Sequence, residues 1–365
     1  MKVLVLTMDG GNGTLSASLA LKEWLDGQGA ECAVVDFIAE TDPLVNAFAG
    51  CYNLLLRGDL RLAALYMWLA QTGPMDWYIA LNARAGKRAR RLIERERPDV
   101  VVLTSPWVIG PALKALPENG RKRPRALTVV VDLGEGMPVD WGNPKVDLTV
   151  LPTAEARDFL GRRGAGPGNA KVLGMPLSPA LVGQRPSQEE CRQRFGAHGP
   201  LCTVLGGREG GKNALRIADG LLKESTGAAL LVQCGRNRDL LRAASKRKGL
   251  AAVGFVDSMA ELYAASDVVI TKPGALTVSE LVAIRKPFIV DASQAVMPQE
   301  LGNVRFVEER GLGLVARSRQ EIPGMVRSIL GGDMKFKTCD IYGTPRIGAE
   351  ILEGPSRGSL PEARP

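Results

Sequence analysis

Histidine is nearly absent from the sequence, which has a single one, His198, among 365 residues. Histidine is the side chain that titrates most readily near neutral pH, and it is also a frequent zinc ligand. No residues at ligand spacing surround His198, so we expect it to be a surface residue of a linker. Acid–base chemistry must therefore rest on other side chains.

Cysteine and long apolar runs are also scarce. The six cysteines show no CxxC spacing and stand at positions 32, 51, 191, 202, 234 and 339. This pattern indicates reduced thiols in a cytosolic protein, without disulfides or zinc. The first apolar run, Val3–Leu6, is too short for a secretory signal, and the longest uncharged stretches, 44–56 and 62–75, are too short to cross a bilayer. We expect a cytoplasmic protein without a transmembrane helix.

Aromatic residues make up only 5% of the chain, and they are not interleaved with the basic ones. Nucleic-acid binding is therefore not expected, although the net charge is +8 and the pI near 9.3. The positive charge concentrates between Arg84 and Arg97, where seven basic residues stand against two acidic ones. This predicted helix is either a solvated helix face or a patch for anionic membrane lipid.

The segment Cys51–Met75 is apolar nearly all round. Leu62, Leu65, Tyr66 and Leu69 follow the spacing of one helix face. Such a helix is most often part of a core. Beside a basic helix it also fits an element that lies in a membrane interface.

Short β-branched runs alternate with helical stretches, and the rhythm restarts after a Pro/Gly-rich stretch. The expected strands are 3–6, 33–37, 100–103, 127–131 and 148–151, and then 201–205, 229–233, 251–253, 268–271 and 288–290. The pattern predicts an α/β protein of two Rossmann-like domains facing a cleft. We place the domains at 1–173 and 201–340, with a linker at 174–200 and a C-terminal segment at 341–365 whose last dozen residues we expect to be disordered.

A glycine-rich turn follows the first strand of each domain. Asp9–Thr14 precedes a helix expected near Ser16, and Gly206–Lys212 leads into a helix around Leu215. Glycines let a ligand approach the backbone closely, and a helix N-terminus attracts anions. The first turn matches neither the dinucleotide fingerprint nor a P-loop. The second, with four glycines and two cations, is either a diphosphate cradle or a flexible surface loop.

A third motif spans Thr271–Glu280. A strand is expected to end at Thr271, and a helix to begin at Thr277 or a neighbour, where its dipole can hold phosphate. Glu280 lies one turn into that helix. Its carboxylate can accept both hydroxyls of a ribose; the alternative is an ordinary glutamate that stabilises the helix by charge.

These motifs resemble those of a known family. Residues 274–280 look like the donor-site signature of the peptidoglycan N-acetylglucosaminyl transferase. Residues 234–237, 254–259, 271–280 and 299–304 resemble, in order and spacing, the monogalactosyldiacylglycerol synthase and processive diacylglycerol glycosyltransferase family. The resemblance weakens before residue 200, where 11–13, 98–99, 132, 141, 147 and 174–176 fall at family positions. It implies a GT-B fold, with an acceptor-binding first domain and a UDP-sugar-binding second domain, and transfer without a metal or other cofactor.

The resemblance also implies roles for single residues. Uracil would lie against the backbone near Phe255 and Val256, and ribose on Glu280. The diphosphate would lie on the loop with Gly207, Gly210 and Gly211 and on the amides of Gly274, Ala275, Leu276 and Thr277. Gln299 and Glu300 would hold sugar hydroxyls, with Asn303 supporting them, and Arg236 and Asn237 belong to the same donor site. On the acceptor side the matching residues are Gly11, Asn12, Gly13 and Thr14.

The chain departs from the family at three histidine positions, which here are Thr14, Ser105 and Met137. Displacement at the sugar carbon needs a base near the acceptor hydroxyl. Asp9 matches an acidic position of the lipid-synthase turn and is the predicted base, with Asp132 and Glu135 as second choices. The alternative for Asp9 is to cap the helix or brace the turn, and for Asp132 capping of a strand end is favoured.

The predicted function is transfer of a hexose from a UDP-sugar to a lipid acceptor such as diacylglycerol, with inversion. The predicted partners are the UDP-sugar, the lipid and an anionic membrane surface at the inner face of the cell membrane. Two alternatives remain open. One is a UDP-sugar-dependent enzyme that uses a soluble acceptor or acts as an epimerase, and the other is a catalytically impaired UDP-sugar-binding protein.

Overall fold

The computed structural model describes residues 1–8, 13–42, 46–47, 83–117, 123–166, 168–183, 186–256 and 258–353. Three predictions fall outside the described residues. They are the base Asp9 with the neighbouring Gly11 and Asn12, the apolar segment 51–75 and the disordered tail.

The first domain is built on a parallel sheet of six strands in the order β2-β1-β3-β4-β5-β6. The strands are β1 (Lys2–Thr7), β2 (Glu31–Asp36), β3 (Val100–Leu103), β4 (Arg125–Val129), β5 (Leu148–Leu151) and β6 (Ala170–Val172). The five predicted strands are confirmed, with ends shifted by one or two residues. The sequence did not reveal β6, because it has three residues and an exposed lysine in its middle.

The second domain repeats the design with the strand order β12-β11-β10-β7-β8-β9. Its strands are β7 (Leu201–Leu205), β8 (Ala229–Gln233), β9 (Leu250–Val253), β10 (Val268–Thr271), β11 (Phe288–Asp291) and β12 (Leu314–Ala316). All five predicted strands are again found, and β12 is the additional one. The α/β prediction of two Rossmann-like domains is confirmed.

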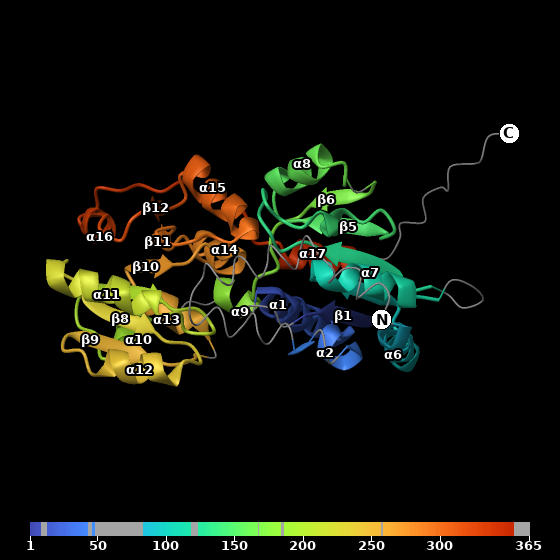
Figure 1. The fold of residues 1–365 in the computed structure, drawn as a ribbon, viewed down its shortest axis with the longest axis horizontal. Coiled ribbons are helices and arrows are strands. Elements are labelled where there is room, and N and C mark those ends of the chain that lie inside the picture. The colour runs from blue at the N-terminus through green and yellow to red at the C-terminus, as the bar shows by residue number, and fades with distance from the viewer. Residues whose placement is uncertain are drawn as a thin grey trace.

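Helices cover both sheets, and the two domains lie end to end (Figure 1). In the first domain they are α1 (Gly13–Gly27), α2 (Phe37–Thr41), α6 (Ala83–Glu96), α7 (Pro106–Ala115), the 3₁₀ turn η1 (Val139–Gly142) and α8 (Ala154–Arg162). In the second they are α11 (Asn213–Glu224), α12 (Arg238–Ser245), α13 (Met259–Ala265), α14 (Ala275–Ala283), η2 (Pro298–Glu300), α15 (Leu301–Arg310) and α16 (Ile322–Leu330). No helix among the described residues is long and apolar enough to cross a membrane.

The predicted linker contains two short helices, α9 (Pro179–Val182) and α10 (Gln188–Arg194). Its Met175 and Leu177 are fully buried, whereas His198 is exposed, as predicted for a linker surface. The linker is therefore packed against the rest of the protein at Met175 and Leu177.

The last helix, α17 (Thr344–Glu353), returns to the first domain. Its Ile347 and Ile351 are fully buried in a cluster with residues of β1 and α1. Arg125 of β4 donates to the backbone and carboxylate oxygens of Glu350 at 2.7 and 3.2 Å. The C-terminal segment, predicted only as a separate piece, thus ties the end of the chain to the first sheet.

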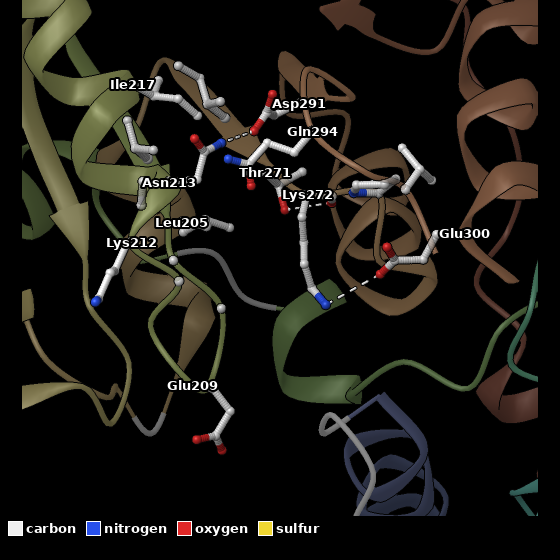
Figure 2. A pocket seen from close by; sticks show the side chains of 18 of the residues that line it. Leu205, Glu209, Lys212, Asn213, Ile217, Thr271, Lys272, Asp291, Gln294 and Glu300 are labelled. Atoms are coloured by element: carbon white, nitrogen blue, oxygen red, sulfur yellow. Dashed lines mark hydrogen bonds and ion pairs between the residues drawn. The ribbon is translucent and has the colours of Figure 1, made fainter. Parts of the chain in front are cut away.

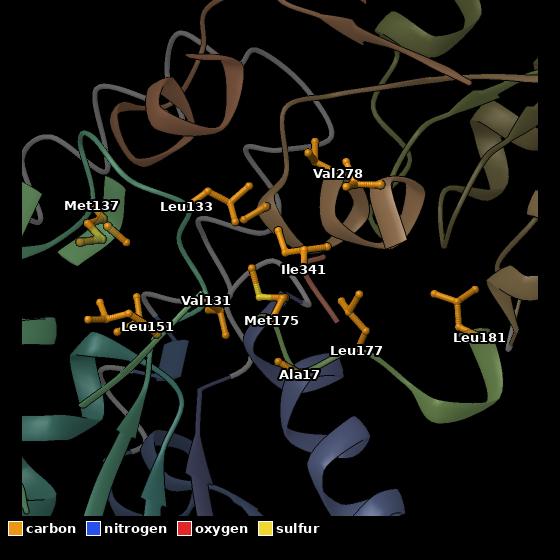
Figure 3. Packing of buried hydrophobic residues seen from close by; sticks show 14 of the residues in the cluster. Ala17, Val131, Leu133, Met137, Leu151, Met175, Leu177, Leu181, Val278 and Ile341 are labelled. Atoms are coloured by element: carbon orange, nitrogen blue, oxygen red, sulfur yellow. The ribbon is translucent and has the colours of Figure 1, made fainter. Parts of the chain in front are cut away.

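One apolar cluster crosses from domain to domain. Figure 3 shows Ala17 and Leu133 of the first domain, Met175 of the linker, Val278 of α14 and Ile341 in this cluster. Burial of such apolar surface is the main favourable term in packing two units together. The two domains are therefore packed against each other through this shared cluster.

Polar contacts fix the same junction. Asn303, only 1% exposed, accepts from the Leu133 N–H at 3.3 Å and donates to the Pro273 oxygen at 2.8 Å. The Gly302 N–H donates to the Glu135 oxygen at 2.9 Å, and the Glu135 carboxylate pairs with Arg305. The loop after β4 is thereby bound to the start of α15.

Candidate active site

The second domain has a pocket at the carboxyl ends of its strands. From β7 the chain moves outward to β8 and β9, and it then crosses to the other side of β7 for β10. Ligands bind at such a switch point in open α/β sheets. The lining includes the loop after β7 (206–209 and 211–213), the residues after β10 (272 and 273), and 291, 294–297 and 300 after β11.

The glycine loop after β7 is held in a defined shape. Gly210 has φ +69°, and a Cβ there would lie 2.1 Å from the Cys234 oxygen, so only glycine fits. The N–H groups of Gly210 and Gly211 donate to the oxygens of Gly207 and Gly206. These two predicted site residues therefore shape the loop, and their amides are engaged within it.

Asn237 serves the same loop. Its side-chain nitrogen donates to the Gly210 oxygen at 2.8 Å, and its oxygen accepts the Leu240 N–H at 3.0 Å as the N-cap of α12. Both ends of this amide are used in bracing. The structure thus places Asn237 behind the pocket, where it fixes the loop.

The N-terminus of α14 lies beside the pocket. The helix begins at Ala275 with Gly274 as its N-cap, directly after Pro273, which lines the pocket. The first N–H groups of a helix have no acceptor within it, and the helix dipole adds partial positive charge. Ala275, Leu276 and Thr277 therefore offer amides to an anion, as predicted for the diphosphate.

Glu280 lies one turn further along α14. Tyr263 of α13 donates its hydroxyl to the Glu280 Oε2 at 2.7 Å. Burial raises the pKa of Glu280 to about 7, and the hydrogen bond from Tyr263 opposes that rise. A carboxylate held by one oxygen keeps the other for a ligand hydroxyl.

Phe255, which follows β9, and Arg236, which follows β8, contact each other outside the residues that line the pocket. Phe255 is 46% exposed, and the Arg236 guanidinium lies 5.1 Å from its ring centre. The contact is a cation–π pair that presents a flat, partly cationic surface. Val256 is only half-buried next to it. Phe255 and Val256 are the residues predicted to border the uracil, and Arg236 was predicted as a donor residue without a stated contact.

Charged and polar groups line the pocket, and Gln299 lies next to one of them, Glu300. Lys272 forms an ion pair with Glu300, with 3.3 Å between Nζ and Oε1 (Figure 2). Across the pocket, Asn213 donates to Asp291 at 2.5 Å. The buried Oε1 of Gln299 has no hydrogen-bond partner within the described part of the chain. Buried oxygens are nearly always hydrogen-bonded, so this one is suited to accept from a ligand.

Sequence reasoning missed several of these groups. Lys272, Asn213 and Asp291 were not predicted to line the pocket, and Tyr263 was not linked to Glu280. Lys272 directly follows β10, and Asp291 is the last residue of β11. Their places at strand ends could have identified them as pocket residues, because ligands bind there in parallel sheets. The Tyr263 contact gives no such signal, because it joins two helices through their packing.

On the acceptor side, the structure describes Gly13 and Thr14 of the four predicted residues. Gly13 opens α1, and the Thr14 hydroxyl donates to the Met8 oxygen at 2.7 Å. Thr14 therefore braces the turn after β1. Asp9, the predicted base, lies outside the described residues, so its place in the site stays a prediction.

Asp132 lies in the loop that follows β4. Trp141, fully buried, donates its indole N–H to the Asp132 Oδ2 at 2.7 Å. Burial raises the pKa of Asp132 to about 6; the negative charge of Glu300 adds to the rise, and the Trp141 bond opposes it. Asp132 and the pocket residue Glu300 thus lie close enough to influence each other across the domain junction.

Comparisons with known proteins match both halves of the chain. Residues 15–177 match the family model described as monogalactosyldiacylglycerol (MGDG) synthase. Residues 201–330 match the glycosyltransferase family 28 C-terminal domain.

Curated relatives align over most of the chain. It is 28% identical over 348 residues to the probable chloroplastic monogalactosyldiacylglycerol synthase of Nicotiana tabacum. That alignment covers 90% of this chain and 64% of the plant protein. It is 25% identical over 351 residues to the processive diacylglycerol beta-glucosyltransferase of Bacillus pumilus, covering 92% and 88%. The chain therefore spans slightly less than two thirds of the plant protein and most of the bacterial one.

Solved structures show the same fold. MurG of Acinetobacter baumannii superposes with a TM-score of 0.58 at 16% identity, covering 96% of this chain and 99% of that one. HepE of Anabaena, in complex with UDP and glucose, has a TM-score of 0.55 at 13% identity, covering 96% and 95%.

The two sheets, the crevice and these matches define a glycosyltransferase of the GT-B type. Within that class, residues 15–177 match the monogalactosyldiacylglycerol synthase family, and residues 201–330 match the glycosyltransferase family 28 C-terminal domain. The predicted family, fold and enzyme class are confirmed, and the matches support dependence on a UDP-sugar.

Proposed function

We propose that this protein transfers a hexose from a UDP-sugar to a lipid acceptor such as diacylglycerol, with inversion at the sugar carbon. The observation that carries the proposal is the joining of an MGDG-synthase-type domain to a crevice suited to a nucleotide sugar. The relatives named for diacylglycerol products and substrates support the acceptor. Incubation with a UDP-sugar and diacylglycerol vesicles, followed by mass spectrometry of the lipids, tests the reaction.

In this proposal the donor lies along the strand ends of the second domain. Uracil contacts Phe255 and Val256, ribose binds Glu280, and the diphosphate meets the first turn of α14. The sugar hydroxyls reach Gln299 and Glu300. The free Gln299 oxygen and the exposed face of Phe255 support this order.

The departing diphosphate must be stabilised as negative charge develops on it. We propose that the protein does this without a metal ion, through the α14 amides and nearby cations. Lys272 lines the pocket with its side chain 46% exposed, and its amine is paired with Glu300, which also lines the pocket. Preorganised donors at a site of developing charge are among the strongest contributions to catalysis.

The acceptor hydroxyl must lose a proton as it attacks. We propose Asp9 as the group that takes it, since it belongs to the turn after β1 and carries the acidic side chain expected there. The chain has no histidine at the family positions 14, 105 and 137. The proposed general base is therefore a carboxylate.

We further propose that α6 holds the enzyme on anionic lipid at the inner face of the cytoplasmic membrane. Ala89, Leu92 and Ile93 on one side of α6 are buried in the core. Its basic residues 87, 88, 90, 91 and 95 are exposed. The helix lies at the end of the first domain away from the second (Figure 1). A membrane-bound α6 therefore leaves the donor crevice open to solvent.

Replacing Lys87, Arg90 and Arg91 with glutamine is expected to weaken binding to phosphatidylglycerol vesicles roughly 100-fold, at about 1 kcal/mol for each basic residue near an anionic surface. Vesicle co-sedimentation at increasing salt measures the effect. A matched variant replaces three exposed lysines of the second domain, Lys223, Lys246 and Lys248. Equal losses in the two variants, or none in the first, would contradict a specific role of α6.

A further inference from the structure

Tyr263 lies behind the donor site and belongs to none of the predicted site residues. Its side chain is 1% exposed, and its hydroxyl donates to the Glu280 Oε2 at 2.7 Å. The Thr277 side chain lowers the pKa of the same phenol, against the larger effects of burial and the Glu280 charge. Thr277 and Glu280 are three residues apart on α14, which places them on one face of the helix. The phenol thus holds Glu280 directly and lies next to Thr277.

We propose that Tyr263 is a positioning residue for the donor nucleotide: it fixes Glu280 by one carboxylate oxygen and leaves the other to the ribose hydroxyls. This inference rests on the proposed function, since it takes the ribose of a UDP-sugar as the ligand of Glu280. Tyr263 itself does not touch the nucleotide. Its contribution is that Glu280 is already held in place when the donor arrives.

The chemistry of the pair supports this role. A buried carboxylate without a partner is unfavourable, and a hydrogen bond to a charged group is stronger than one between neutral groups. Burial, with the charge of Glu280, raises the pKa of Tyr263 well above its usual 10, so the phenol remains a donor throughout the neutral range. The hydrogen bond from Tyr263 lowers the pKa of the Glu280 carboxyl and so favours its ionised form.

The pairing gives donor binding a pH dependence with a defined sign. Ionised Glu280 accepts from the ribose, and protonated Glu280 does so less well. Affinity should therefore fall as the pH is lowered through the pKa of Glu280, which is about 7. Without the Tyr263 hydroxyl that pKa rises further, so the fall should begin at a higher pH.

Calorimetric titration with UDP-glucose and UDP-galactose between pH 6 and 9 tests the proposal. Tyr263→Phe is expected to bind the preferred donor roughly 10-fold more weakly at pH 7, in line with the loss of one charge-assisted hydrogen bond. Its affinity midpoint should lie at higher pH than in the wild type. Tyr342→Phe, which removes a phenol near the linker, is the matched control and should bind as the wild type does.

Glu280→Gln provides a second variant that does not depend on the folding of Tyr263→Phe. It should bind weakly at every pH, and adding Tyr263→Phe to it should cause little further loss. The inference is overturned if Tyr263→Phe binds with wild-type affinity and midpoint, or if Glu280→Gln keeps the wild-type pH profile. If the wild type binds neither UDP-sugar at any pH, the proposed function itself fails, which is a distinguishable result.

Discussion

Asp9→Asn is expected to lower kcat for glycolipid formation by roughly 10²–10⁴-fold, the usual contribution of a general base. The affinity for the donor should stay within a factor of two or so of the wild type, because a base acts on the transition state and not on the bound nucleotide. Initial rates at saturating UDP-sugar, with donor affinity measured separately, check both expectations.

Asp132→Asn is the matched comparison, because an asparagine oxygen can still accept the Trp141 indole N–H. If Asp9 is the base, the Asp132 variant should lose less than about 10-fold, as expected for a group that only shapes the cleft. The pKa of Asp132 is about 6 in the protein. If Asp132 takes the proton instead, the rate should fall below that pH as the carboxylate is protonated. Asp132→Asn should then show the large loss of kcat, and Asp9→Asn the small one.

Gly210→Ala is expected to raise the KM for the donor more than 10-fold and to destabilise the second domain by about 1–3 kcal/mol, the range for strained backbone positions. Position 210 has φ +69°, and the new methyl group would lie 2.1 Å from the Cys234 oxygen and 2.5 Å from the Asn237 Cβ. The loop after β7 must move to admit it. Donor KM and thermal unfolding with and without UDP measure the two effects.

Gly220→Ala, in the middle of α11, is the control for that substitution. No atom lies within 4 Å of a Cβ at position 220, so the methyl group meets open space. Alanine in a helix is more stable than glycine by roughly 0.5–1 kcal/mol. The control should therefore be neutral or slightly stabilising, with unchanged KM. A Gly210→Ala protein that behaves like this control would contradict the account of the loop.

The sequence was sufficient for the ten predicted strands, because buried parallel strands are continuous β-branched runs such as Val100–Leu103. It did not reveal β6 and β12, each only three residues long. The packing of α17 against the first domain was also missed. It depends on contacts of Ile347 and Ile351 with residues of β1 and α1, more than three hundred positions earlier in the chain. Such contacts leave no local pattern.

Only part of the candidate site follows from the sequence. The position of α14, with Glu280 one turn in, follows from local rules for strand ends and helix starts. Asn237 was predicted as a donor ligand, yet its side-chain nitrogen braces the glycine loop and its side-chain oxygen caps α12. A family motif records which residue is needed, and it does not separate a residue that touches the ligand from one that holds its neighbour.

Mass-spectrometric product analysis tests the central claim most directly. Purified protein is incubated with phosphatidylglycerol vesicles containing diacylglycerol and, in separate reactions, UDP-glucose, UDP-galactose and UDP-N-acetylglucosamine, with Glu280→Ala as the control. We predict a hexosyl-diacylglycerol with one of the hexose donors, absent from the control. No glycolipid with any donor, despite UDP-sugar binding that Glu280→Ala abolishes, would contradict a lipid acceptor and favour a soluble acceptor or a binding protein.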